Sequence, residues 1–167
     1  MDPFSVQTST MAGTVYLYSG QSDKAIKHFQ DALDLDPSNT LSLDNLGLAH
    51  IQKGLIEEGL EEVKRAFDKG FSFGSDLAYA YVKAGKVQEA RLLLAQCQRP
   101  EKGKHVPPTI VAGIYAVLGE KERALEWLER AYNEHSGYLP WLKADFVFES
   151  IRNEPRFLAI AKKMGLG

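Results

Sequence analysis

The sequence predicts an all-α protein, an α-α superhelix in which helical hairpins stack on one another and a C-terminal helix caps the last hairpin. Small residues recur five and twelve residues after, and seven residues before, a set of regularly spaced glycines. Apolar residues on both sides of each glycine are spaced three and four apart, which is the period of an amphipathic helix. The glycines, at intervals of 34, 31 and 34 residues, are Gly20, Gly54, Gly85 and Gly119.

Each of these glycines is expected to end the first helix of a pair, because glycine adopts the left-handed conformation of a helix C-terminus at little cost. The stretch "DKAIKHFQDALDL" is the expected second helix of the first pair. The apolar stripe of this helix is formed by Ala25, Ile26, Phe29, Ala32 and Leu33, while charged residues occupy its other faces. Ser22 is placed to cap this helix through its hydroxyl group. The repeating unit is therefore a helix, a tight turn and a second helix.

One hairpin cannot bury its apolar face alone, so neighbouring hairpins must stack. We predict a single domain over residues 1–167, since a chain of this length fits one domain. The third hairpin is three residues short around "KGFSFGSD", which should change its packing angle against the second. The predicted repeats span about 6–39, 40–70, 71–104 and 105–137.

Residues 138–167 break the period and are predicted to form the C-terminal cap, since an array of repeats needs its last apolar face covered. The stretch "NEPRFLAIAKKMG" has the signals of a short helix, with Asn153 as the expected N-cap and Pro155 in the first turn. An apolar cluster precedes this helix, formed by Trp141, Leu142, Phe146, Phe148 and Ile151.

The composition argues against several classes of partner. The 20 basic and 22 acidic residues give a formal net charge of −2, without the basic excess of a nucleic-acid binder. No apolar run reaches the roughly 18–20 residues that span a bilayer, and the N-terminus lacks the pattern of a secretory signal. We expect no nucleic-acid partner, no membrane insertion and a cytoplasmic location, or an extracytoplasmic one within a membrane-anchored parent protein.

No catalytic or cofactor motif is found, so we expect no enzyme activity, no cofactor and no metal site. The histidines have no metal-ligand spacing on one helix face, and one cysteine, Cys97, cannot build a structural zinc site. His50 stands where other repeats carry tyrosine and is interpreted as a packed core residue. The acidic run is interpreted as a solvated helix face; it consists of Glu57, Glu58, Glu61 and Glu62.

The 34-residue period resembles the tetratricopeptide repeat, and Gly59 departs from it by replacing an alanine. This resemblance implies a right-handed solenoid whose first helices line a concave groove for a partner protein. Residues 105–167 are also similar to the C-terminal repeat region of bacterial multidomain regulators, in which repeats follow a transcription-factor, cyclase or kinase domain. The first copy carries the pattern as Gly13, Tyr16, Gly20, Ala25, Phe29, Ala32 and Pro37.

The resemblance implies a non-catalytic module that binds a peptide or helix in this groove, as the regulatory part of a larger signalling or transcription protein. The groove is mainly apolar with two tyrosines, which favours a hydrophobic ligand over a C-terminal carboxylate. Asp44 and Asp76 have the wrong sign for a carboxylate clamp. Packing of these side chains within the array itself remains the alternative. The expected groove residues are Thr14, Leu17, Tyr18, Asn45, Leu48, Ile51, Gln52, Tyr79, Val82 and Lys83.

A second function hypothesis is a homo-oligomerisation scaffold. The first repeat begins without an N-terminal cap, so its apolar face could form a homodimer. The residues expected on this face are Val6, Met11, Val15 and Ile26.

Overall fold

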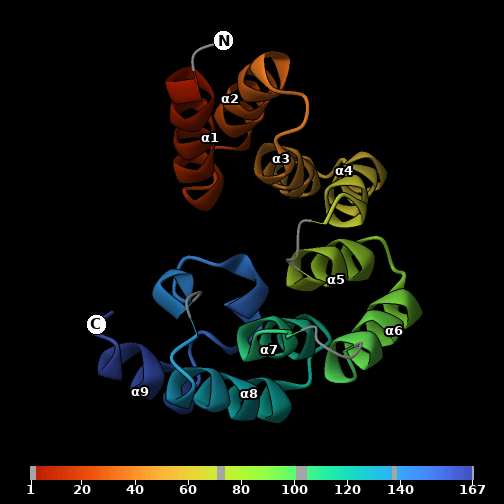
Figure 1. The fold of residues 1–167 in the computed structure, drawn as a ribbon. Coiled ribbons are helices and arrows are strands. Elements are labelled where there is room, and N and C mark those ends of the chain that lie inside the picture. The colour runs from red at the N-terminus through yellow and green to blue at the C-terminus, as the bar shows by residue number, and fades with distance from the viewer. Residues whose placement is uncertain (1–2, 71–73, 101–104, 137–138, 167) are drawn as a thin grey trace. The chain divides into compact units, whose positions relative to one another are not determined.

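A computed structural model describes residues 3–70, 74–100, 105–136 and 139–166. These parts of the chain form α-helices and two 3-10 helices joined by short connections, and they contain no strand (Figure 1). The predicted all-α class of paired helices is confirmed. The chain divides into two compact units, Met1–Gly85 and Lys86–Gly167, and the division falls inside the third predicted repeat.

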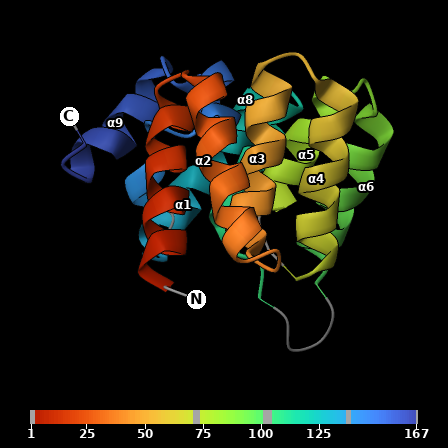
Figure 2. The ribbon, with the colours of Figure 1, turned by 90° about the horizontal axis from the view of Figure 1, so that it is seen from above.

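Unit 1 is organised around one central helix, α3. Helix α1 packs against α2 and helix α3 against α4, and Figure 2 shows these four helices side by side. Helix α3 also contacts α1, α2 and α5, and all its residues from Ser42 to Ile51 are buried. The helices of unit 1 are α1 (Pro3–Tyr18), α2 (Ser22–Leu35), α3 (Thr40–Gln52), α4 (Ile56–Asp68) and α5 (Gly74–Lys83).

Unit 2 has a similar plan around α7. Helix α7 packs against α6, α8 and η2, and its residues from Pro108 to Ala116 are all buried. The tail covers this pair, because η2 packs on α7 and α9 packs on α8. The elements of unit 2 are α6 (Val87–Gln98), α7 (Pro108–Val117), α8 (Lys121–Asn133), η1 (Leu139–Trp141), η2 (Phe146–Ile151) and α9 (Pro155–Lys163).

The predicted glycine turns are confirmed. Gly20, Gly54, Gly85 and Gly119 have φ angles of +73°, +88°, +72° and +77°, and each lies just beyond the first helix of its pair. A side chain at these positions would meet no neighbouring atom, so the backbone conformation alone calls for glycine. The turn geometry is therefore set locally by the sequence.

A different constraint acts on the glycines that lie between α3 and α4. A Cβ atom on Gly47 would lie 2.6 Å from the carbonyl oxygen of Gly59, and a Cβ on Gly59 would in turn overlap the carbonyl oxygen of Gly47. The two helices thus touch backbone to backbone, which explains why glycine replaces the expected alanine at position 59.

Two predicted helix caps are wrong. Ser22 is the first residue of α2 rather than its cap, and its hydroxyl donates to Gln52 Oε1 at 3.1 Å. Glu154, not Asn153, precedes α9, and it makes no side-chain cap bond. In α9, Pro155 stands at the first helical position, where its missing N–H group would have had no partner within the helix.

The tail is held to α8 by ion pairs and by burial. Arg156 donates from Nε and Nη2 to the two carboxylate oxygens of Glu129 at 2.8 and 2.9 Å, and from Nη1 to Glu122 at 3.0 Å. Phe157 and Ile151 are completely buried. Trp141 departs from the predicted apolar cluster, because its side chain is 57% exposed.

Candidate functional site

The candidate site is one face of unit 1, formed by the first helices of the first two pairs. On each helix the residues concerned are spaced by four, three and four positions, so they lie along one side of the helix. Asn45 on α3 donates a hydrogen bond to Thr14 on α1, so the two rows meet at this point. We call this surface the α1–α3 face; its exposed or half-buried residues are Gln7, Met11, Thr14 and Tyr18 on α1 and Leu41 and Gln52 on α3, and the row on α3 also includes the buried Asn45 and Leu48.

A hollow of about 540 Å³ opens at one end of the α1–α3 face. Met11 and Leu41 form apolar walls, and their side chains are 63% and 41% exposed. The size is within the range of small-ligand pockets and suits one or two side chains of a partner. The residues that line the hollow are Val6, Gln7, Thr10, Met11, Asp36, Asn39 and Leu41.

Hydrogen bonds between α1 and α3 fix the floor beneath this face. The hydroxyl groups of Thr10 and Ser42 lie 2.7 Å apart and are buried. Asn45 donates from Nδ2 to the hydroxyl oxygen of Thr14 at 3.3 Å. Asn39 accepts from the backbone N–H of Ser42 at 2.9 Å and thereby caps α3. The polar groups of Thr14 and Asn45 are thus engaged with each other.

Part of the predicted groove is interior. Leu17, Leu48 and Ile51 are 0%, 1% and 4% exposed, so they pack inside the protein and offer no accessible surface to a partner. The apolar spacing along these helices is correct, but each helix has apolar residues on two sides and the spacing does not say which side remains accessible. Gln52 is exposed, and it accepts a hydrogen bond from Ser22.

Of the remaining predicted groove residues, Asn45 is buried and only 5% exposed, whereas the others reach the surface. Tyr18, Tyr79 and Val82 are half-buried and Lys83 is exposed. The Lys83 ammonium lies 5.2 Å from the centre of the Tyr79 ring, a cation–π contact along α5. Lys83 therefore covers an aromatic ring in this structure.

The four residues predicted for self-association differ in how far their side chains are exposed. Met11 and Val15 are 63% and 68% exposed and lie one turn apart on α1. Ile26 is half-buried. Val6 is buried, although it is one of the residues that line the hollow. Two of the four residues therefore provide most of the accessible apolar surface.

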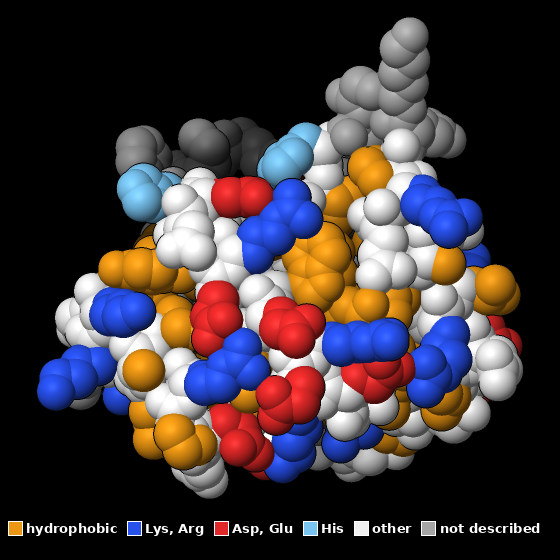
Figure 3. Space-filling view, turned by 90° about the horizontal axis from the view of Figure 1, so that it is seen from below, with side chains coloured by type: hydrophobic (Ala, Val, Ile, Leu, Met, Phe, Trp, Pro, Cys, Tyr) orange, Lys and Arg blue, Asp and Glu red, His pale blue; other side chains and the backbone are white. Residues whose placement is uncertain are grey.

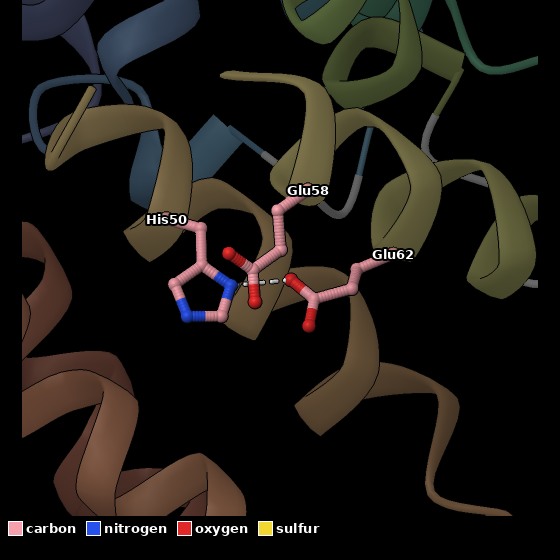
Figure 4. A group of neighbouring side chains, drawn as sticks. All are labelled: His50, Glu58 and Glu62. Atoms are coloured by element: carbon pink, nitrogen blue, oxygen red, sulfur yellow. Dashed lines mark hydrogen bonds and ion pairs between the residues drawn. The ribbon is translucent and has the colours of Figure 1, made fainter. Parts of the chain in front are cut away.

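A polar cluster between α3 and α4 was missed by the sequence interpretation. His50 is buried, as predicted, but its Nδ1 atom lies 2.6 Å from Glu62 Oε2 (Figure 4). Glu62 is half-buried rather than solvated, and burial raises the pKa of its carboxyl group while the His50 hydrogen bond opposes that shift. The pair joins two helices, so no spacing within one helix reveals it.

The surface charges of the described residues are mixed. On the face drawn in Figure 3, Lys and Arg side chains lie among Asp and Glu side chains, with hydrophobic groups between them. None of the helices in the described ranges has both the length and the apolar character required to cross a bilayer.

Comparison with known proteins finds a match between part of this site and a repeat-family model. Residues 13–54, which include most of the α1–α3 face, match the family model described as TPR repeat. The chain is 35% identical over 126 residues to a mitochondrial pentatricopeptide repeat-containing protein of Arabidopsis thaliana, covering 75% of this chain and 18% of that protein. It is 36% identical over 56 residues to the BBSome complex member BBS4 of Bos taurus, covering 34% of this chain and 11% of that protein.

Among solved structures, the MamA protein aligns with 96% of this chain and 88% of its own, at a TM-score of 0.47 and 17% sequence identity. By contrast, the chain spans less than a fifth of the length of the two curated relatives, the pentatricopeptide repeat-containing protein and BBS4.

Proposed function

We propose, from the premise that this chain carries tetratricopeptide repeats, that it binds a peptide or helix of a partner protein through the α1–α3 face. Repeats of this family mediate contacts between proteins and act without catalysis of their own. The observation that carries the proposal is the hollow whose walls, Met11 and Leu41, remain exposed. Exposed apolar walls lose contact with water when a side chain enters, which drives binding.

The chemistry of the hollow favours an apolar anchor residue in the partner. Gln7 and Asn39 stand among the apolar walls and can orient the backbone of a bound segment. Hydrogen bonds from the hydroxyl and backbone N–H of Ser38 lower the pKa of Asp36, which keeps this residue negatively charged. A negative charge at the hollow repels a terminal carboxylate, so we propose an internal, apolar segment as the ligand.

The test is to select peptides from a displayed random library on the 167-residue chain and to measure their affinity by fluorescence polarisation. Leu41→Glu should weaken binding of the selected peptides at least tenfold, because it places a charge in the apolar wall. Leu92→Glu is the matched control, since Leu92 is 65% exposed on α6 and is not among the residues that line the hollow. Peptides that bind both variants equally well would contradict the proposed site.

A second candidate function is self-association through α1. It is favoured by Met11 and Val15, which expose apolar side chains one turn apart. Light scattering with size-exclusion chromatography, over a tenfold range of concentration, gives the solution mass. A dimer that Val15→Glu converts to a folded monomer supports this function, whereas a monomer at every concentration excludes it.

We also propose that the chain serves as the regulatory part of a larger signalling or transcription protein in the cytoplasm. The small share of its curated relatives that the chain covers is compatible with a module in a longer chain. Pull-down of the full-length protein with and without residues 1–85 would test whether unit 1 recruits the partner.

A further inference from the structure

Three side chains from two helices of unit 1 converge on one point. The His50 ring comes from α3, and Glu58 and Glu62 come from α4. Their potential ligand atoms all lie within 4.8 Å of one another, and the shortest separation is the 2.6 Å between His50 Nδ1 and Glu62 Oε2. Figure 4 shows both carboxylates directed toward the same edge of the imidazole ring.

The backbone explains this convergence. Glu58 and Glu62 are four residues apart, so they lie on one side of α4. The contact between Gly47 and Gly59 brings α3 unusually close to that side, and His50 follows Gly47 by one turn. The cluster is therefore built on rigid, packed helices rather than on a loop.

We propose that His50, Glu58 and Glu62 bind a divalent transition-metal cation, and that zinc is the best match. Imidazole nitrogen and carboxylate oxygen are both zinc ligands, and three protein ligands leave a fourth position for water. Calcium and magnesium prefer oxygen ligands alone, so the histidine argues against them. This inference is independent of the proposed partner binding.

The geometry requires only small movements. Zinc bonds of about 2.0–2.1 Å in a tetrahedral arrangement set the ligand atoms about 3.3 Å apart. His50 and Glu62 would separate by less than 1 Å from their hydrogen-bonded distance, and the exposed Glu58 side chain would turn inward. Metal binding would take the place of the hydrogen bond between His50 Nδ1 and Glu62 Oε2.

The charges around the cluster favour a cation. Glu58 and Glu62 place two carboxylates beside the His50 ring, and Glu62 is half-buried, while the positive charge of Arg65 is also felt at Glu62. A bound dication would offset both the burial and the repulsion between the two carboxylates.

The alternative is that His50 and Glu62 form only a packing contact. Under that alternative Glu58 has no part in the cluster, because its side chain is exposed and packing needs only the other two. Glu58 therefore separates the two interpretations without disturbing the core.

The test is titration of the full chain with zinc chloride, followed by isothermal calorimetry at pH 7 in a buffer that does not bind metal. Wild-type protein should bind one zinc ion at this cluster, and Glu58→Gln should weaken binding at least tenfold. Glu61→Gln is the matched control, because Glu61 is exposed on the same helix and stands outside the cluster. Its affinity should equal that of the wild type.

A second measurement identifies the ligands. Cobalt(II) in place of zinc should give the visible absorption of a four-coordinate site, and Glu62→Gln should abolish it while the melting temperature without metal shows that the variant is folded. Leu41→Glu should leave zinc affinity unchanged, so that failure of the partner-binding proposal is distinguishable. No zinc binding by the wild type, or equal affinities for Glu58→Gln and Glu61→Gln, would overturn the proposal.

Discussion

Asp145 combines a structural hydrogen bond with an unfavourable environment for its charge. Its carboxylate accepts from the backbone N–H of Val147 at 3.0 Å and so caps the helix η2. Burial nevertheless raises its pKa from 3.8 to about 6, although the Val147 hydrogen bond and the charge of Arg152 lower it. The folded protein therefore holds this proton more tightly than the unfolded chain does.

Stability should consequently fall as the pH rises from 4 to 7. The contribution of Asp145 is fully present below its unfolded pKa and is lost as the pH passes through about 6, a change on the order of 2 kcal/mol. Asp145→Asn keeps the oxygen that accepts from Val147 and removes the titration. We expect this variant to match the wild type near pH 4 and to exceed it by that amount near pH 7.5, as measured by urea unfolding.

The control for Asp145→Asn is Glu149→Gln, an exposed carboxylate in the same short helix η2. It should leave the pH dependence of unfolding unchanged. If Asp145→Asn gives the same difference from the wild type at both pH values, the raised pKa of Asp145 is wrong.

At the scale of elements, the two helices of the α3–α4 hairpin approach each other very closely. Gly47 and Gly59 let the two backbones touch, and the buried side chains of Leu60, Val63 and Ala66 fill the space beside that contact. The pairing fixes where His50 meets α4. The stability of this hairpin therefore depends on glycine, which has no side chain, at positions 47 and 59.

Gly59→Ala tests this dependence by the sign of its effect. In an exposed helix the change would stabilise the protein by roughly 0.5–1 kcal/mol, because alanine is the better helix former. Here the added methyl group overlaps the carbonyl oxygen of Gly47 and Ile51, so we expect a loss of about 1–3 kcal/mol in the free energy of unfolding. Chemical denaturation measures the difference, and a stabilised variant would show that the helices can separate at little cost.

The sequence predicts the local features of this hairpin, but not the contacts between its two helices. The turn at Gly54 follows from local backbone chemistry and was predicted. The burial of Leu48 and Ile51 was not, because helix periodicity marks an apolar side without saying whether a neighbour covers it. The His50–Glu62 contact joins residues whose distance is set by the glycine pair, and a pattern within one helix contains no information about it.

At the scale of the whole molecule, each compact unit has one helix that its neighbours surround. In unit 1 this helix is α3, and in unit 2 it is α7. Periodicity predicted the helices and their pairing well. The division between Gly85 and Lys86 was not predicted, because it depends on how many contacts cross each turn. The hollow was also missed, since Asp36 and Asn39 belong to a connection that the repeat pattern does not describe.

Amide hydrogen exchange should be slow in the two central helices, α3 and α7. We expect the slowest exchange within unit 1 in residues 43–51 and within unit 2 in residues 110–116, because opening these segments requires their neighbours to separate first. The outer helices α2 and α9 provide the comparison in each unit. Faster exchange in α3 than in α2, or in α7 than in α9, would contradict this order.

The placement of the tryptophans has a practical consequence for such measurements. The chain has two tryptophans, Trp127 on α8 and Trp141 in η1, and both lie in unit 2. Arg130 stacks on the half-buried ring of Trp127, 4.8 Å from its centre, whereas Trp141 is largely exposed. Indole fluorescence therefore reports on the second half of the chain, while circular dichroism records helices in both halves. Two unfolding curves from one sample that fail to superimpose would reveal the halves melting separately.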